Sequence, residues 1–142
     1  MRKLYSDYIG GVVTTFPIPG STCSAAGGIN NLDQCVEGYS TGRTSHGYMR
    51  DADGTLHYPI DAPGAAFPSL LAISDKGEMV GGAEPKSETE SYGVYFSANG
   101  NASYQYPGAV YTKFTGINSL GLISGDYQTA DGLIQGFIVR VR

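Results

Sequence analysis

The sequence predicts an all-β fold made of one repeated unit, and three observations predict it. A Pro-Gly pair recurs at Pro19, Pro63 and Pro107, at intervals of 44 residues. The chain contains 21 glycines and 11 tyrosines but only 15% charged residues, a composition typical of strands and tight turns. A fixed period of this size is typical of repeat architectures. A second landmark keeps the same interval: Gly28-Ile29-Asn30, Ala72-Ile73-Ser74 and Gly116-Ile117-Asn118.

Each unit is expected to contain four short strands. In the third unit, extended runs at 113–117, 122–127 and 134–139 are separated by turns at 118–121 and 129–132. No stretch of the chain shows the 3.6-residue hydrophobic period of a helix.

The first unit supplies the fourth strand, at 56–60, after a hairpin turn at 51–54. Four antiparallel strands in about 40 to 50 residues match one blade of a β-propeller. Pro17 and Pro59 fall in the fourth strand. Because proline cannot donate a hydrogen bond to a ladder, this strand is expected at the outer edge of its blade.

Positions that recur every 44 residues are expected to form the core between blades. A third recurring position holds Glu37, Gly81 and Gly125, and its glycines predict a crowded backbone. The second repeat is longer at 83–91, which predicts a surface loop. The expected core residues are Ile29, Ile73, Ile117, Cys35, Met79 and Ile123.

The 142 residues are expected to form a single repeat domain of three blades. Residues 11–18 align with a fourth strand, and residues 4–8 align loosely with the end of a third strand. Repeat one covers 21–64, repeat two covers 65–108 and a partial repeat three covers 109–142.

Closed propellers have about four to eight blades, so three blades per chain predict completion by oligomerisation. The strand at 11–18 of one chain is expected to complete the last blade of another chain. Two chains would give a six-bladed homodimer, whereas a rotation that does not close would give an open filament.

The composition argues against several classes of partner. The net charge is −4 and no Lys/Arg cluster exists, so nucleic acid is a poor partner. The sequence contains no apolar run of about 18 residues, so no membrane span is expected. Met1-Arg2-Lys3 begins like a signal peptide, but Leu4-Tyr5-Ser6-Asp7 is polar where an apolar stretch should follow.

Two interpretations of Cys23 and Cys35 stay open: a disulfide, or two small apolar side chains in neighbouring strands.

A motif runs through nearly the whole chain. Its residues are Gly116-Ile117-Asn118, Gly121, Ile123, Gly125, Tyr127, His46-Gly47-Tyr48, Asp53-Gly54, Ile60-Asp61 and Pro63-Gly64-Ala65. This unit resembles the HAF-type extracellular repeats of bacteria. Repeat two departs most, with Ala72, Ser74 and Ala83 in place of Gly, Asn and Tyr. The resemblance implies a β-propeller-like fold and an extracellular or cell-surface location, and it implies no activity.

No catalytic residue, metal site or cofactor is expected. Asp51-Ala52-Asp53-Gly54 begins like a calcium loop but lacks the later bidentate glutamate, so a hairpin turn is favoured. His46 and His57 lack the spacing of zinc ligands. No Gly-x-Ser-x-Gly elbow occurs in the sequence.

A ligand site is expected where the loops between second and third strands lie beside the blade connections. Exposed aromatic side chains beside polar groups suit a glycan or a peptide. Lys113 and the acidic stretch 84–90 lie in the same region. Tyr39 and Tyr127 either contact a ligand or, as the alternative, pack within the repeat. The candidate ligand-binding residues are Tyr39, Arg43, His46, Tyr111, Asp126 and Tyr127.

Three function hypotheses remain. The preferred one is a non-catalytic extracellular-type repeat protein that acts in binding, for example of a glycan, or in surface structure. The first alternative is a structural subunit of an extracellular filament built by head-to-tail strand exchange. The second is a small hydrolase or lyase on the propeller scaffold, with paired carboxylates drawn from Asp61, Asp75 and Asp126.

Overall fold

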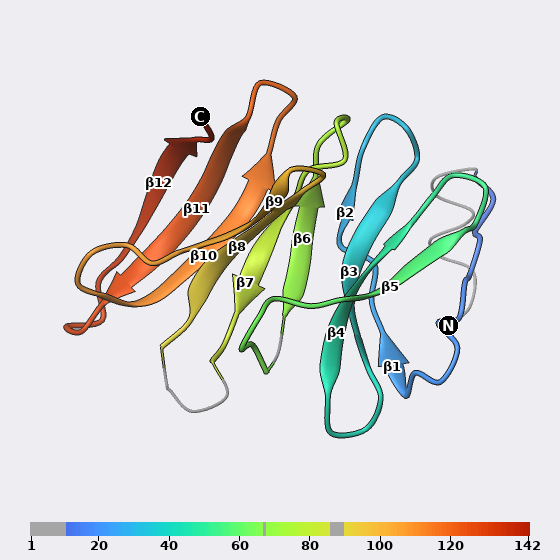
Figure 1. Ribbon diagram of the computed structural model, residues 1–142, viewed down its shortest axis with the longest axis horizontal. Helices are drawn as coiled ribbons and strands as arrows, with labels where there is room; N and C mark the ends of the chain where they lie inside the picture. Colours follow the sequence, from blue (N-terminus) through green and yellow to red (C-terminus); the bar gives the residue numbers. More distant parts are fainter. Residues whose placement is uncertain (1–10, 67, 86–89) are drawn as a thin grey trace.

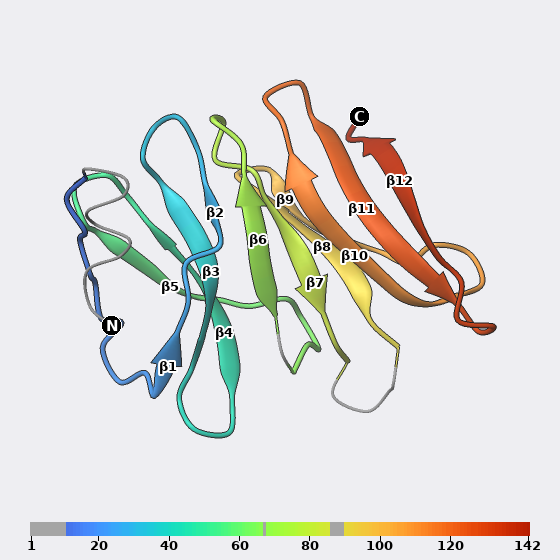
Figure 2. The same ribbon diagram turned by 180° about the vertical axis from the view of Figure 1, so that it is seen from behind.

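The computed structural model describes residues 11–66, 68–85 and 90–142. Every helix or strand element among these residues is a β-strand, and the strands form three antiparallel sheets. This confirms the expected all-β class. The sheets follow one another along the chain and lie side by side, with the first and third at opposite ends of the molecule (Figure 1). The view from behind shows the same order (Figure 2). The described residues include no helix long and apolar enough to span a bilayer.

The first sheet contains β1 (Cys23–Ser24), β2 (Gly28–Ile29), β3 (Cys35–Ser40), β4 (Ser45–Arg50) and β5 (Leu56–Ile60). β1 and β2 both pair with β3, so the expected innermost strand is split in two. The intervening Ala-Ala-Gly run has no β-branched or aromatic residue, which disfavours a continuous strand. Pro59 lies in β5, which among the described strands pairs only with β4, so its expected edge position is confirmed.

The second sheet contains β6 (Ser69–Ile73), β7 (Met79–Ala83), β8 (Tyr92–Ser97) and β9 (Gly100–Tyr104), paired in that order. It has the four strands expected of one complete repeat. The lengthened loop of this repeat joins β7 to β8, and its residues 86–89 lie outside the described residues.

The third sheet contains β10 (Ala109–Ile117), β11 (Leu122–Thr129) and β12 (Ile134–Arg140). The run expected at 113–117 is therefore the second half of a longer strand that begins at Ala109. Among the described residues β12 pairs only with β11, so the sheet has three strands where the second sheet has four.

The turn after the innermost strand is built the same way in each sheet. The side-chain oxygens of Asn30, Ser74 and Asn118 each accept two backbone N–H groups from the residues two and four positions later. Such side-chain acceptors fix tight turns, because they satisfy backbone donors that no strand pairs. The turns of the second and third sheets close with Gly77 and Gly121 at φ values of 78° and 73°, where glycine is favoured, and the turn of the first sheet closes with Asp33 at 58°.

The crowding expected at Gly81 and Gly125 is confirmed. A Cβ atom on Gly81 would lie 1.7 Å from the carbonyl oxygen of Ser69, and one on Gly125 would lie 2.5 Å from that of Lys113. The neighbouring strands carry irregular registers at these places, after Leu70 and after Phe114. A bulged neighbour that bends toward the glycine therefore causes the crowding.

Successive sheets pack face to face, β6 against β3 and β10 against β7. The sets of buried residues that fill these two spaces are Val36, Leu70, Ile73, Val94 and Phe96 for the first, and Val80, Phe114 and Ile123 for the second. The expectation that Ile73 and Ile123 belong to the core is confirmed, since they are 5% and 2% exposed.

The same expectation is wrong for Ile29 in the single chain. Ile29 is 69% exposed, although it holds the position of Ile73 and Ile117 in the repeat. The physical reason is that, among the described residues, no sheet lies against the first sheet on the side away from the second (Figure 1).

Candidate functional site

Residues 16–18 cover part of the open side of the first sheet. Ile18 is buried against Cys35, Tyr39 and Tyr48. The ring of Phe16 meets the ring of Tyr48 edge-on, with centroids 6.0 Å apart and planes at 68°. Residues 11–18 belong to no strand in the single chain. Their expected strand pairing needs a second copy and stays a prediction, and the expected third-strand end at 4–8 lies outside the described residues.

Phe16 stands where fourth-strand residues stand in the other repeats. Ile60 and Tyr104 follow it at intervals of 44 residues and lie in β5 and β9. The ring of Tyr104 lies 6.1 Å from that of Phe114 and 6.0 Å from that of Phe137, both in the third sheet. Ile60 likewise packs on the cluster between the first and second sheets. In all three repeats, therefore, this position packs on the sheet that follows it in the chain.

The outer face of the third sheet is open. Ile138 on β12 is 74% exposed. Met49 and Tyr95 hold the matching positions of the first and second sheets, two residues after the third-strand glycine as Ile138 is, and both pack in the spaces between sheets. The faces at the two ends of the molecule thus carry apolar side chains of the type that the inner interfaces bury.

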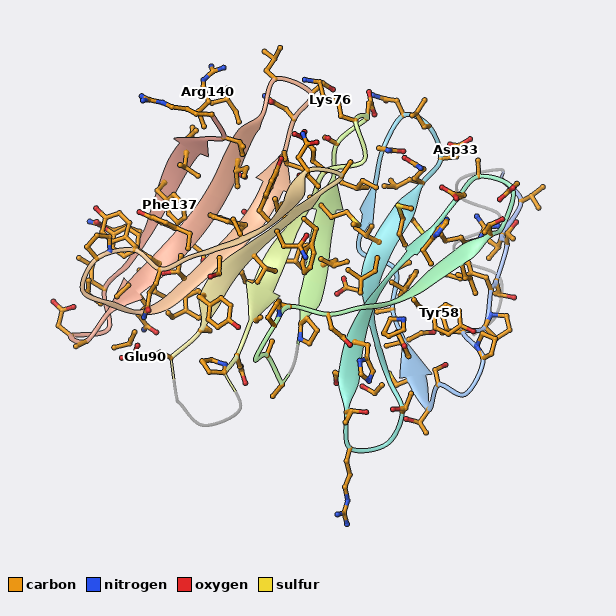
Figure 3. The ribbon with its side chains drawn as sticks, in the orientation of Figure 1. Asp33, Tyr58, Lys76, Glu90, Phe137 and Arg140 are labelled. Carbon is orange, nitrogen blue, oxygen red and sulfur yellow. The ribbon has the colours of Figure 1, made fainter. Side chains whose placement is uncertain are left out.

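Hydrogen bonds link the first sheet to the second at the end of the molecule where the turns after β2 and β6 lie. The Asn31 backbone N–H donates to Oδ1 of Asp75 at 2.9 Å, and the Asn31 side-chain amide donates to Oδ2 at 2.8 Å. These bonds, together with the hydroxyl of Ser119, hold the pKa of Asp75 below its ordinary value. Figure 3 labels Asp33 and Lys76 at this end and Glu90 at the opposite end.

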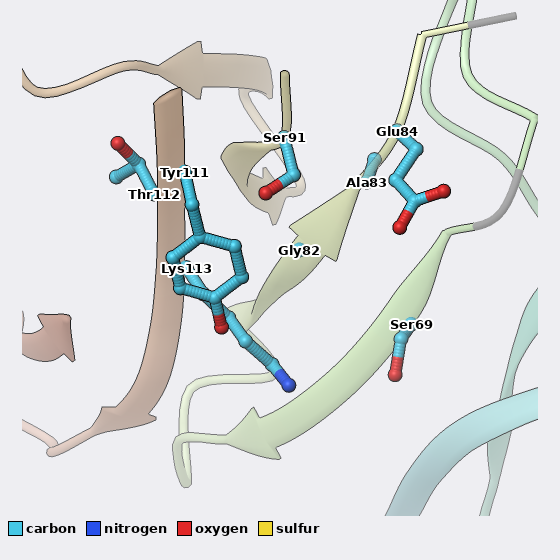
Figure 4. Close-up of a pocket in the computed structure, with 8 residues that line it drawn as sticks. All are labelled: Ser69, Gly82, Ala83, Glu84, Ser91, Tyr111, Thr112 and Lys113. Atoms are coloured by element: carbon cyan, nitrogen blue, oxygen red, sulfur yellow. The ribbon is translucent and has the colours of Figure 1, made fainter. Parts of the chain in front are cut away.

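A pocket of about 120 Å³ lies between the second and third sheets (Figure 4). The aliphatic chain of Lys113 crosses Gly82, where an added Cβ would lie 3.2 Å from Lys113 Cγ. In Figure 4 the Lys113 ammonium extends toward the side of the pocket that carries Ser69. Glu84 also lines the pocket, so it carries a cation, a carboxylate and hydroxyl groups.

Two hydroxyl groups in this pocket are unusual. The Ser91 Oγ is buried and has no hydrogen-bond partner among the described residues. Such a group costs about 1–3 kcal/mol unless a partner satisfies it. Burial, and then the hydrogen-bonded carboxylate of Asp126, raises the pKa of Tyr111 to about 12.

The six candidate ligand-binding residues do not form one site. Tyr111 and Asp126 lie together on neighbouring strands beside the pocket. Tyr39 and His46 lie together on the first sheet, with ring centroids 5.4 Å apart, and His46 Nδ1 lies 2.8 Å from Asp61 Oδ1.

The other two candidates stand apart from both pairs. Tyr127 is buried in the third sheet and stacks on Tyr106, with centroids 3.7 Å apart and planes at 5°. Arg43 is exposed in the turn between β3 and β4. The burial of Tyr39 and Tyr127 supports the packing interpretation for both.

Sequence reasoning did not single out the two serines of the pocket. Ser69 and Ser91 line it, but neither belongs to a recognisable motif. Glu84 and Glu90 of the acidic stretch are described, whereas residues 86–89 lie outside the described residues.

The hairpin turn expected at residues 51–54 is confirmed. The Gly54 N–H donates to the Asp51 carbonyl at 3.0 Å, and Gly54 has a φ of 93°. The Asp51 carboxylate accepts from Gln34 Nε2 at 2.8 Å and lies 2.6 Å from His57 Nε2. Within the ranges that the structure covers, no three His, Cys, Asp or Glu side chains gather as metal ligands.

The two cysteines are free and occupy neighbouring strands, with Cys23 exposed on β1 and Cys35 buried on β3. The three aspartates considered for glycoside chemistry have different partners. Asp61 contacts His46, Asp75 contacts Asn31, and Asp126 lies by Tyr111.

Comparisons of the chain with protein-family models, with curated proteins and with solved structures returned no match.

Proposed function

We propose that this chain is a non-catalytic repeat protein that acts by assembly, with its three sheets serving as blades of a β-propeller shared by more than one copy. The observation that carries the proposal is the pair of open end faces. Ile29 and Ile138 hold positions that are buried or partly buried between the inner sheets, yet they are 69% and 74% exposed. Exposed strand edges and apolar faces of this kind favour association.

A two-copy ring of six blades is the preferred assembly. Each end face of one copy would then meet the opposite end face of the other, and the ring would leave neither end face open. A head-to-tail contact that does not close would instead build a filament, the first alternative function. Negative-stain microscopy separates them, since the preferred assembly gives small closed rings and the alternative gives fibres.

The assembled protein would serve in binding or in surface structure. The resemblance to HAF-type repeats supports an extracellular or cell-surface setting. The pocket of Lys113, Ser91 and Tyr111 supports a small polar ligand such as a sugar, because it combines hydrogen-bond donors and acceptors with an aromatic ring.

The ligand part of the proposal is tested by calorimetric titration with neutral and acidic monosaccharides. Lys113→Met keeps the packing of the side chain on Gly82 but removes the ammonium group, and it should abolish binding. Lys76→Met is the matched control, because Lys76 lies far from the pocket. Figure 3 shows it at the opposite end of the molecule from Glu90, which precedes the pocket residue Ser91. Equal heats for both variants, or no heat from the unaltered chain, would reject this site. Release of monosaccharide from an added oligosaccharide would instead favour the hydrolase or lyase alternative.

A further inference from the structure

The third sheet has a vacant place beside β12. In the second sheet, the corresponding place is filled by β9, which pairs with β8 from Gly93–Tyr104 to Ser97–Gly100. Among the described residues nothing pairs with the outer edge of β12. The backbone donors and acceptors of such an edge are open to pairing with another strand.

Residues 11–16 occupy a fourth-strand place, but no described strand pairs with them to form a sheet. Phe16 packs on Tyr48 of the following sheet, as Tyr104 of β9 packs on Phe114. Yet residues 11–15 are all exposed, with Val12 at 96%, and they pair with no strand. The segment is uncharged and carries Val12, Val13, Thr14 and Thr15, residue types that favour strands.

The two vacancies are complementary. Within the described residues, one end of the molecule has a sheet of three strands without a fourth, and the other end has a fourth-strand segment without a sheet to join. The inner interfaces show how such halves fit together, because β9 both completes the second sheet and packs Tyr104 on the third. The missing contact is therefore a continuation of the interface that the chain already forms twice.

We infer that residues 11–16 of a second copy pair antiparallel with β12 and complete the third sheet. This inference rests on the assembly proposed above and names the segment that makes the contact. The register follows from the second sheet, where Gly82 pairs with Gly93 and Gly93 pairs with Tyr104.

In the third sheet, Asp126 stands 44 residues after Gly82 and pairs with Gly136. Gly136 therefore pairs with Phe16 of the second copy, because Phe16 stands where Tyr104 does. Two residues farther along the strands, Ile138 pairs with Thr14, as Tyr95 pairs with Ala102. In this arrangement Phe16 keeps its contact with Tyr48 of its own chain, and Ile138 is covered by the first sheet of the second copy.

Disulfide trapping tests the register. The test variant carries Thr14→Cys and Ile138→Cys in a chain whose exposed native cysteine is removed by Cys23→Ser. Directly opposite residues in an antiparallel pair lie about 4.5–5.5 Å apart between Cα atoms, within the range of a disulfide. The matched control carries Val12→Cys together with Ile138→Cys, a diagonal pair about 7–8 Å apart.

Mild oxidation should link the first variant into a covalent dimer, or into a ladder of multimers if the assembly is a filament, and should leave the control as single chains on a denaturing gel. Light scattering of the unaltered chain separates the two ways to fail. A multimer whose matched pair crosslinks no better than the control overturns the strand pairing but leaves the assembly. A monomer overturns both.

Discussion

Phe16 and Tyr48 meet edge-on at 6.0 Å, although Phe16 lies outside every sheet of its own chain. The guanidinium of Arg50 lies 5.0 Å above the Phe16 ring and holds it from a second direction. An aromatic residue outside a sheet is usually a poorly fixed one, yet this ring is half-buried in the place of a fourth-strand side chain. The contact therefore holds Phe16, at the end of the segment 11–16, against the first sheet of its own chain.

Truncation of Phe16 should weaken both the fold and the assembly. Phe16→Ala removes the ring that packs on Tyr48, and for this half-buried side chain we expect a loss of about 2 kcal/mol in the free energy of unfolding. Urea unfolding followed by tyrosine fluorescence measures it. Val13→Ala is the control, because Val13 is 72% exposed in the single chain and its loss should cost little. Equal losses for the two variants would show that the Phe16 contact does not hold the segment.

A charge on the outer face of the third sheet should block assembly and leave the fold intact. Ile138→Lys places an ammonium group where the first sheet of a second copy would pack, and burying it there without a partner is costly. Its 74% exposure means that the isolated chain loses little. We expect monomers by light scattering, with an unchanged far-UV spectrum.

Leu120→Lys is the matched control for that variant. Leu120 is 71% exposed in a turn, and Lys76 already occupies the corresponding position of the second repeat. This variant should assemble like the unaltered chain. If Ile138→Lys also assembles, the outer face of β12 is not part of the contact.

Two adjacent glycines should respond very differently to alanine. Gly81→Ala would bring a methyl group to within 1.7 Å of the Ser69 carbonyl oxygen, and backbone must move to relieve it. We expect a loss of about 3 kcal/mol or more in the free energy of unfolding. Gly82→Ala meets only the flexible Lys113 side chain, at 3.2 Å, and should cost about 1 kcal/mol or less. Thermal unfolding compares them, and similar melting temperatures would contradict the crowding.

The contact between Asn31 and Asp75 predicts a dependence of stability on pH. The hydrogen bonds from Asn31 lower the pKa of Asp75 in the folded state below its ordinary value of 3.8. The stabilisation is therefore present above pH 4 or so, and it is lost as the pH falls through the lowered pKa. Both Asp75→Asn and Asn31→Ala should flatten the acid side of the curve of unfolding free energy against pH. A slope below about pH 4 that matches the unaltered chain in both variants would show that this contact contributes nothing.

The 44-residue period predicts most of the architecture but not which of its positions are buried. Ile29 and Ile73 are the same residue at the same place in the repeat, yet their exposures are 69% and 5%. The difference depends on a neighbouring sheet, which the local sequence does not encode. The stacking of Tyr106 on Tyr127 was equally beyond reach, because Ile18 and Ala62 hold the position of Tyr106 in the other repeats.

The candidate ligand site was predicted only in part. Tyr111 and Asp126 were expected there and lie together beside the pocket. The other four candidates lie elsewhere: Tyr39 and His46 belong to the first sheet, Arg43 to the turn between β3 and β4, and Tyr127 is buried in the third sheet. Ser91 lines the pocket through an irregular bridge to Tyr111 on the next sheet, and no spacing rule in the sequence predicts a contact of that kind.

The most direct test of the account is the native mass of the 142-residue chain in solution, measured by native mass spectrometry across a range of concentrations. The account predicts a species of two copies, each of 15.0 kDa, that persists on dilution. A single 15.0 kDa species at every concentration would contradict it, because the faces of Ile29 and Ile138 would then stay uncovered.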